Sequence, residues 1–167
     1  MQARHSDNSP PANQLRALQC SLEYRLPGKP FWAFVAVSSS AAAQRLERML
    51  SRSIAHWQRV RLAPTTADIA SLCAGEMGQE LWVRLEHCPQ EQAVRLGERL
   101  LFYRDLAVKR QLSLVFVLHP ATLEQLPYDL ISMASFQGPV EPAVAPPPAS
   151  RLATTIPQKG LHYRKTN

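Results

Sequence analysis

Residues 31–37 read FWAFVAV, and the turn-forming residues PGKP at 27–30 lead into them. An apolar run without polar alternation is typical of a strand that is buried on both faces. Residues 114–118, LVFVL, form a second run of the same kind. The two runs predict central strands of a sheet that other elements cover on both sides.

The stretch after the first strand has the period of an amphipathic helix. Residues 41–57 read AAAQRLERMLSRSIAHW, and any of the serines at 38–40 can cap the helix that they predict. The residues of its apolar stripe are Leu46, Met49, Leu50, Ile54 and Trp57. We expect this stripe to face the core.

Further strands and helices continue the alternation along the chain. Residues 58–62 (QRVRL) and 80–85 (ELWVRL) have strand patterns. Helices are predicted from Thr65 or Thr66 to about Ala74, over 90–110, and over 121–134 with an interruption at Pro127. The aromatic pair Phe102 and Tyr103 of the long helix is expected in the core.

The predicted order of elements is β-α-β-α-β-α-β-α. Alternation of apolar strands with helices predicts right-handed crossovers and therefore a parallel sheet. We expect an α/β fold of three layers, with a doubly wound, mostly parallel sheet of four or five strands. Residues 14–26 fit either a leading helix or an added edge strand.

The two ends of the chain differ in composition from the middle. Residues 1–13 contain two adjacent prolines and one large apolar side chain, so we expect a disordered segment. Residues 14–140 carry the α/β domain, and residues 141–167 form a proline-rich, basic tail. The prolines at 146–148 fit either a contact with a partner or a solubilising linker.

The cysteines and the net charge indicate in which compartment the protein occurs and which kind of partner it binds. Cys20, Cys73 and Cys88 have neither a C-x-x-C nor a zinc-ligand spacing, which indicates a reducing compartment. The first 14 residues are too polar for a signal peptide, and no apolar run has the length of a membrane span. We therefore expect a cytoplasmic protein without membrane contact. Its net charge of +6 favours an acidic partner.

Ligands of open parallel sheets bind beyond the carboxyl ends of the strands. A phosphate site at that edge needs a glycine-rich turn and a lysine. Residues 38–45 read SSSAAAQR and contain neither, and no other predicted strand-to-helix junction has a nucleotide-binding motif. The sequence therefore predicts no nucleotide hydrolysis and no bound cofactor.

Polar residues follow two of the predicted strands, at Glu86, His87, Cys88 and His119. Cys88 and His119 are the candidate catalytic pair, because a histidine can activate a thiolate and the topology can bring both to one edge. The competing interpretation is a buried structural cysteine and a histidine that bonds a loop carbonyl. A metal site is not expected, because adjacent residues of a strand point to opposite faces.

Basic residues of the first helix and the following strand form a candidate binding surface. Its members are Arg45, Arg48, Arg52, Arg59 and Arg61. They could bind phosphates of nucleic acid or an acidic partner, and the competing interpretation is a solvated helix face. Aromatic residues do not alternate with these arginines, which disfavours a stacking platform for single strands.

Three stretches carry a resemblance to a known family. FWAFVAV runs into a helix, LWVRLE ends in Glu86, and residues 100–135 contain the pair Arg104-Asp105, a buried strand and the segment PYDL at 127–130. From Phe31 to about Val140 the sequence resembles degenerate P-loop modules of RecA-like or STAND-like type. Such modules occur as adaptor or effector-associated domains in bacterial regulatory and defence proteins. The resemblance implies an α/β scaffold without its phosphate loop, whose surface makes protein contacts.

We therefore expect a non-enzymatic adaptor that binds a protein partner in a bacterial regulatory or defence assembly. The alternative is a nucleic-acid-binding accessory domain that uses the arginine-rich helix face. The identity of the partner and the oligomeric state stay open at the level of the sequence.

Overall fold

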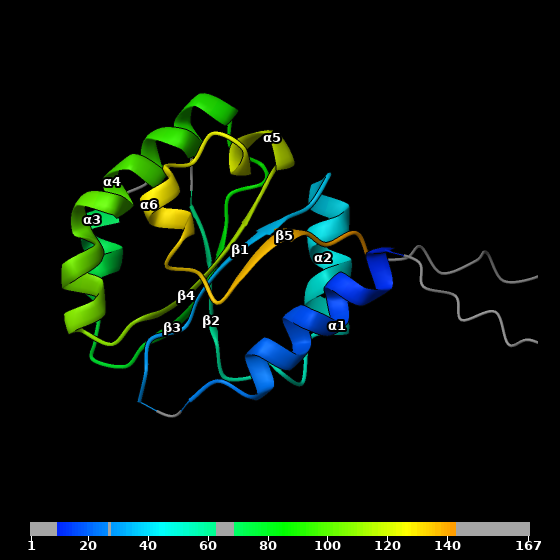
Figure 1. Cartoon of the computed structure of the whole chain (residues 1–167), viewed down its shortest axis with the longest axis horizontal. Helices are drawn as coiled ribbons and strands as arrows, with labels where there is room; N and C mark the ends of the chain where they lie inside the picture. Colours follow the sequence, from blue (N-terminus) through cyan, green and yellow to red (C-terminus); the bar gives the residue numbers. More distant parts are fainter. Residues whose placement is uncertain (1–9, 27, 63–68, 143–167) are drawn as a thin grey trace, which may run out of the picture.

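The structure, a computed structural model, describes residues 10–26, 28–62 and 69–142. These residues form a five-stranded sheet between two layers of helices (Figure 1). All four pairs of neighbouring strands are parallel, and their order across the sheet is β2-β3-β4-β1-β5. The predicted α/β fold with a doubly wound parallel sheet is confirmed.

The elements follow the predicted order closely. The strands are β1 (Trp32–Ala36), β2 (Gln58–Arg61), β3 (Glu80–Arg84), β4 (Ser113–Leu118) and β5 (Phe136–Pro139). The helices are α1 (Pro10–Glu23), α2 (Ser40–Met49), α3 (Ile69–Cys73), α4 (Gln90–Lys109), α5 (Pro120–Leu123) and α6 (Tyr128–Ile131). The segment left open between helix and edge strand is therefore a helix, and it begins at Pro10. The predicted cap at Thr65 or Thr66 lies outside the described residues.

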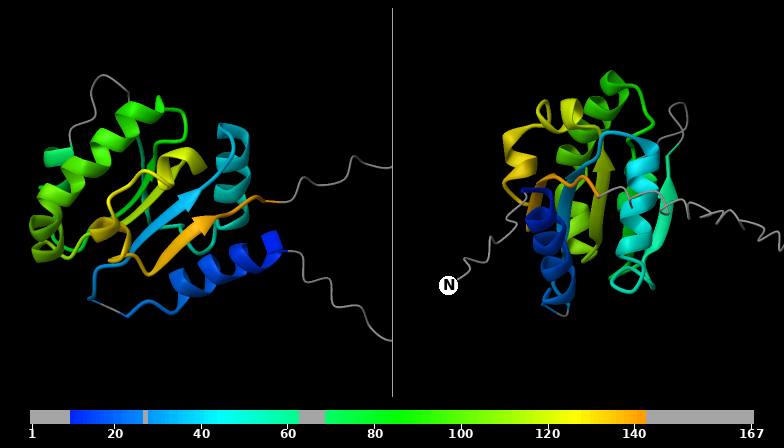
Figure 2. Two further views of the ribbon diagram at one scale, coloured as in Figure 1. Left: turned by 45° about the horizontal axis from the view of Figure 1, so that its top comes forward. Right: turned by 90° about the vertical axis from the view of Figure 1, so that its right-hand side faces the viewer.

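The direction of the crossovers decides which helices cover which face. The connection from β1 to β2 crosses the sheet one way, and the connections from β2 through β3 and β4 to β5 cross it the other way. Right-handed crossovers then place their helices on opposite faces. Accordingly, α2 packs on one face and α3, α4 and α6 pack on the other (Figure 1, Figure 2). The helix α1, which precedes β1 and belongs to no crossover, packs on the α2 face.

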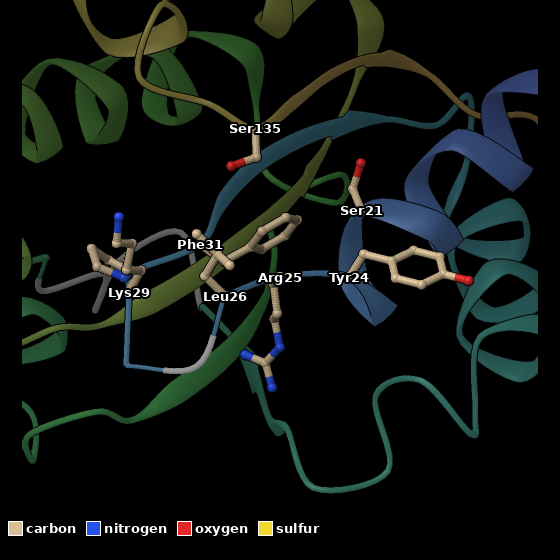
Figure 3. A pocket seen from close by; sticks show the side chains of 8 residues that line it. Ser21, Tyr24, Arg25, Leu26, Lys29, Phe31 and Ser135 are labelled. Atoms are coloured by element: carbon tan, nitrogen blue, oxygen red, sulfur yellow. The ribbon is translucent and has the colours of Figure 1, made fainter.

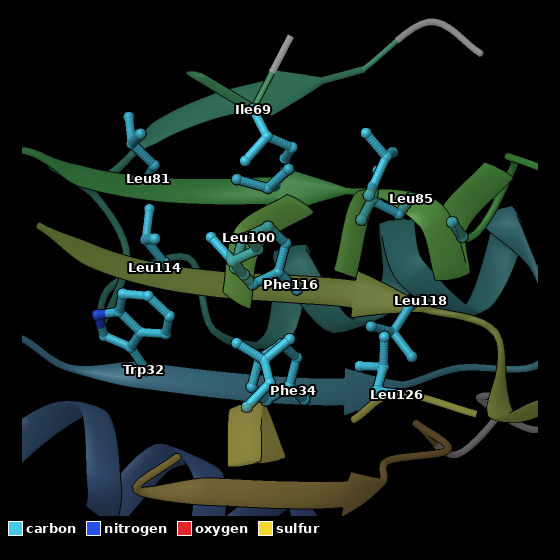
Figure 4. Packing of buried hydrophobic residues seen from close by; sticks show 14 of the residues in the cluster. Trp32, Phe34, Ile69, Leu81, Leu85, Leu100, Leu114, Phe116, Leu118 and Leu126 are labelled. Carbon is cyan, nitrogen blue, oxygen red and sulfur yellow. The ribbon is translucent and has the colours of Figure 1, made fainter. Parts of the chain in front are cut away.

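The side chains of β1 and β4 alternate between two cores, because successive residues of a strand point to opposite faces. On the α4 face, Phe34 stacks on Phe116 with ring centroids 5.6 Å apart (Figure 4). On the α2 face, the strands contribute smaller side chains, among them Ala33, Val35 and Val117. Both faces are apolar, which explains the unbroken runs in the sequence.

The helix α2 confirms the predicted serine cap and corrects one core residue. The Ser39 hydroxyl accepts a hydrogen bond from the Ala42 N–H at 3.1 Å. Leu46 and Trp57 are buried as predicted, but Met49 is 50% exposed. The prediction for Met49 was wrong because this residue lies about 100° around the helix from the buried Leu50, at the edge of the stripe.

The helix α4 corrects a second core prediction. Phe102 is 81% exposed, although Tyr103 packs partly against the core. The buried stripe of α4 includes Ala93, Leu96, Leu100 and Ala107. Phe102 lies two residues beyond Leu100, about 200° around the helix, and therefore points away from the sheet.

The last part of the domain differs most from the prediction. The predicted helix over 121–134 consists of α5 and α6, which are separated before Pro127. The chain then forms β5, an edge strand that the sequence did not predict. Gly138 and Pro139 lie in this strand, and both residues are depleted in strands except at edges.

Candidate functional site

The carboxyl ends of β1 and β4 are where this topology would hold a ligand. β1 continues into α2 on one face, and its neighbour β4 continues into α5 on the other. Adjacent strands whose connections leave toward opposite faces open a crevice at their carboxyl ends. Ser38 follows β1 and His119 follows β4, so the structure places both sequence-predicted segments at this edge.

A carboxylate of the chain itself lies at the loop after β1. Glu141 accepts hydrogen bonds from the Ser38 backbone N–H at 2.7 Å and from the Ser38 hydroxyl at 3.0 Å. Its neighbour Val140 is buried and donates its N–H to the Ala36 carbonyl at 2.8 Å. The ladder between β1 and the chain after β5 therefore continues up to the carboxylate that occupies this loop.

Arg84 and Glu86 form a buried ion pair beneath the first turn of α2. The Glu86 side chain has 0% exposure, and the Arg84 side chain has 10%. Arg84 Nε and the Ser40 hydroxyl each donate to Glu86 Oε1 at 3.0 Å, and Arg84 Nη2 also donates to this oxygen. Arg84 Nη2 further donates to the Ser40 carbonyl at 3.3 Å. The network joins the end of β3 to the start of α2.

This environment keeps both partners charged. Burial raises the pKa of the Glu86 carboxyl, but the hydrogen bonds from Arg84 and Ser40 and the guanidinium charge outweigh it and lower the pKa overall. The hydrogen bond to Glu86 raises the pKa of Arg84. At neutral pH Glu86 therefore has no proton to donate as a general acid, and its role is that of a structural anion.

The Cys88 thiol contacts a backbone carbonyl and the neighbouring His87, and neither of them can act as its base. Its thiol lies 3.7 Å from the Leu62 carbonyl oxygen and 3.8 Å from His87 Nε2. His87 Nε2 lies 2.6 Å from the same carbonyl oxygen, to which it donates, so it has no lone pair for the thiol proton. Burial and the charge of Glu86 raise the pKa of the Cys88 thiol, and Arg61 lowers it less. The thiol is protonated at neutral pH.

His119 has a local role at the start of α5. Its Nδ1 accepts a hydrogen bond from the Ala121 N–H at 3.2 Å, and the side chain thereby caps the helix. The hydrogen bonds of Cys88 and His119 thus go to separate groups, and none between the two is found in the described part of the chain. Among the residues that the structure describes, no three His, Cys, Asp or Glu side chains are grouped to hold a metal ion.

The structure places the predicted arginines on α2, on β2 and in the turn between them. We call Arg45, Arg48, Arg52, Arg59 and Arg61 the arginine surface. All but Arg45 are exposed, and none of the four exposed side chains forms an ion pair within residues 10–26, 28–62 and 69–142. A hollow of about 390 Å³ lies between α2 and β2 and is lined by Gln44, Glu47, Arg48, Ser51 and Arg59.

A second hollow lies at the opposite, amino edge of the sheet, and the sequence did not predict it. It has a volume of about 310 Å³ and lies between the end of α1 and the segments that enter β1 and β5 (Figure 3). Tyr24 and Leu26 line it and are 80% and 61% exposed. Arg25, also in its lining, is already paired with Glu80 and lies over the Trp57 ring at 5.1 Å. The positive charge of Arg25 is therefore largely balanced by groups of the domain itself.

Sequence reasoning missed two residues of the carboxyl edge. Arg84 interrupts the apolar strand ELWVRL two residues before Glu86, and this spacing places both side chains on one face, so a signal existed. Glu141 offered no signal, because 103 residues separate it from Ser38. It had been assigned to the tail, whereas its side chain is part of the folded edge.

Comparison of the chain with protein-family models, with curated proteins and with solved structures finds no match. The described helices include none that is long and apolar enough to cross a membrane. The function must therefore be argued from the geometry of the chain.

Proposed function

We propose that this chain is a non-enzymatic α/β adaptor module that binds an acidic protein partner through the arginine surface. The observation that carries this proposal is that Arg48 of α2 and Arg59 of β2 line one hollow, both exposed and without an ion pair among the described residues. Arg52, in the turn after α2, and Arg61, in β2, are exposed as well. Uncompensated charge of one sign steers and binds a partner of the opposite sign. The proposal agrees with the resemblance to degenerate nucleotide-binding modules of bacterial regulatory and defence assemblies.

The state of the carboxyl edge supports a role without catalysis. Glu141 occupies the loop after β1, Glu86 is neutralised by Arg84, and the Cys88 thiol is protonated. Each of these three groups is thus engaged by another group of the chain. The arginine surface, in contrast, has four exposed side chains without an ion pair among the described residues.

The lining of the hollow favours a protein over a nucleic acid. The most exposed aromatic side chains are Tyr24, just after α1, Phe102 of α4 and Tyr128 of α6, and none of them lines this hollow. Bases would therefore find no aromatic platform beside the arginines.

A capture experiment with matched charge variants tests this function. The tagged protein is exposed to extracts of its native cells with and without nuclease, as wild type, as Arg48→Glu/Arg59→Glu and as Arg16→Glu/Arg99→Glu. Arg16 and Arg99 are exposed residues of α1 and α4, so the second variant changes the net charge equally but leaves the arginine surface intact. We expect a nuclease-resistant protein partner that the first variant loses and the second keeps. Recovery of nucleic acid alone would contradict the adaptor function and support the alternative, a nucleic-acid-binding accessory domain.

A further inference from the structure

The strand β2 is an edge of the sheet with an outer side that the described residues do not pair. It bonds to β3 on one side, and no other described strand lies beyond it (Figure 4). None of its four residues is buried. Unpaired N–H and C=O groups of an edge strand are a template for an added strand.

The register of β2 with β3 decides where its side chains point. Arg59 is aligned with Trp82, and Arg61 is aligned with Arg84. Trp82 belongs to the core on the α2 face, and Arg84 bonds to Ser40 of α2. Aligned residues of neighbouring strands point to the same face, so both arginines of β2 lie on the α2 side.

The opposite face of β2 carries Gln58 and Val60, which are aligned with Leu81 and Val83. Val60 packs partly against the core on the α3 and α4 side, and so does Leu62, the residue that follows β2. The edge therefore presents positive charge on one face and, toward its carboxyl end, the apolar side chains of Val60 and Leu62 on the other. The hollow with Arg48 and Arg59 adjoins the charged face.

We propose that β2 accepts an extended acidic segment of a partner protein as an added strand, with acidic residues at alternate positions and apolar residues between them. This inference rests on the proposed function and specifies how the arginine surface would bind its partner. Backbone hydrogen bonds along β2 supply affinity, and the alternate side chains supply specificity. The acidic side chains lie beside Arg59 and Arg61, and the apolar ones lie beside Val60.

Charge decides which strand the edge accepts. A second copy of this chain would bring the arginines of two β2 strands opposite one another, and like charges across a strand pair are destabilising. An uncharged strand would leave both arginines without counter-charges. The same residues that protect the edge from self-association therefore select an acidic strand.

Peptides of one composition but different order test the strand mode. Fluorescein-labelled EVEVEVE and EEEEVVV carry equal charge, and fluorescence anisotropy measures their binding to the full-length protein. We expect the alternating peptide to bind about tenfold more tightly, because only it matches both faces of β2 while making main-chain hydrogen bonds. Methylation of its alternate backbone nitrogens removes donors at unchanged charge, and we expect it to abolish this advantage.

Protein variants locate the bound peptide. We expect Arg59→Glu and Arg61→Glu each to weaken binding of the alternating peptide by about tenfold, and Arg99→Glu to change it by less than about twofold. Amide hydrogen exchange of residues 58–61 should slow in the complex. Exchange that is unchanged at saturating peptide would overturn the strand mode.

The outcomes separate the two proposals. Equal binding of both peptides, insensitive to N-methylation but weakened by Arg59→Glu, would overturn the added strand and leave the acidic-partner function standing. Failure of both peptides to bind, together with nuclease-sensitive capture in the preceding experiment, would overturn both. Binding of the alternating peptide alone, lost on N-methylation, supports both.

Discussion

Glu86 has no exposed side-chain surface, and its charge is balanced by Arg84. In Arg84→Met the carboxylate stays buried without its partner, so we expect the free energy of unfolding to fall by about 3–5 kcal/mol. The double variant Arg84→Met/Glu86→Leu removes both charges and should recover most of this loss. Urea unfolding of the three proteins measures the difference. A loss below about 1 kcal/mol for Arg84→Met would contradict a buried pair.

Single residues also show where sequence patterns succeed and fail. Ser39 and Trp57 were identified as a possible cap and a core residue from local spacing, because capping and amphipathicity depend on nearby positions. Phe102 was expected in the core from its aromatic character, yet α4 turns it to solvent. Residue type is a weaker guide to burial than position on the helical stripe.

At the scale of elements, α2 links the first strand to the arginine surface, and its start is held by Ser39. We expect Ser39→Ala to lower the free energy of unfolding by about 1 kcal/mol, because the Ala42 N–H loses its acceptor. Ser51→Ala is the matched control, an exposed serine just beyond α2, and should change stability by less than about 0.5 kcal/mol. Chemical denaturation of both variants gives the values. Equal losses in the two would show that the cap does not hold this helix.

The strand β5 shows the limit of pattern reading at the same scale. Apolar or alternating runs in the sequence predicted four of the strands, but residues 136–139, FQGP, contain neither pattern. It is a strand because α5 and α6 bring the chain back to the open side of β1, where Val35 aligns with Gly138. An element of this kind is stabilised by its neighbour rather than by its own propensity.

At the scale of the whole molecule, the domain ends later than β5. Val140 is fully buried, and Glu141 bonds to Ser38. We expect a chain shortened to residues 1–142 to keep the stability of the full chain, because it retains these contacts. A chain that ends at residue 139 should lose at least about 2 kcal/mol, from the burial of Val140 and the hydrogen bonds beyond it. Thermal and urea unfolding of the two shortened chains test this, and equal stability would place the boundary earlier.

The sequence by itself determined the class of fold, the identity of the central strands, the helices between them and the missing phosphate loop. These features depend on hydrophobic period and on residues within a few positions of each other, which local patterns record. The tertiary structure alone decided that Glu141 meets Ser38, that Arg84 and Glu86 lie beneath α2, and that arginines of α2 and β2 share one hollow. Those contacts follow from the order and register of the strands in the sheet. A local sequence pattern does not encode contacts between residues so far apart in the chain.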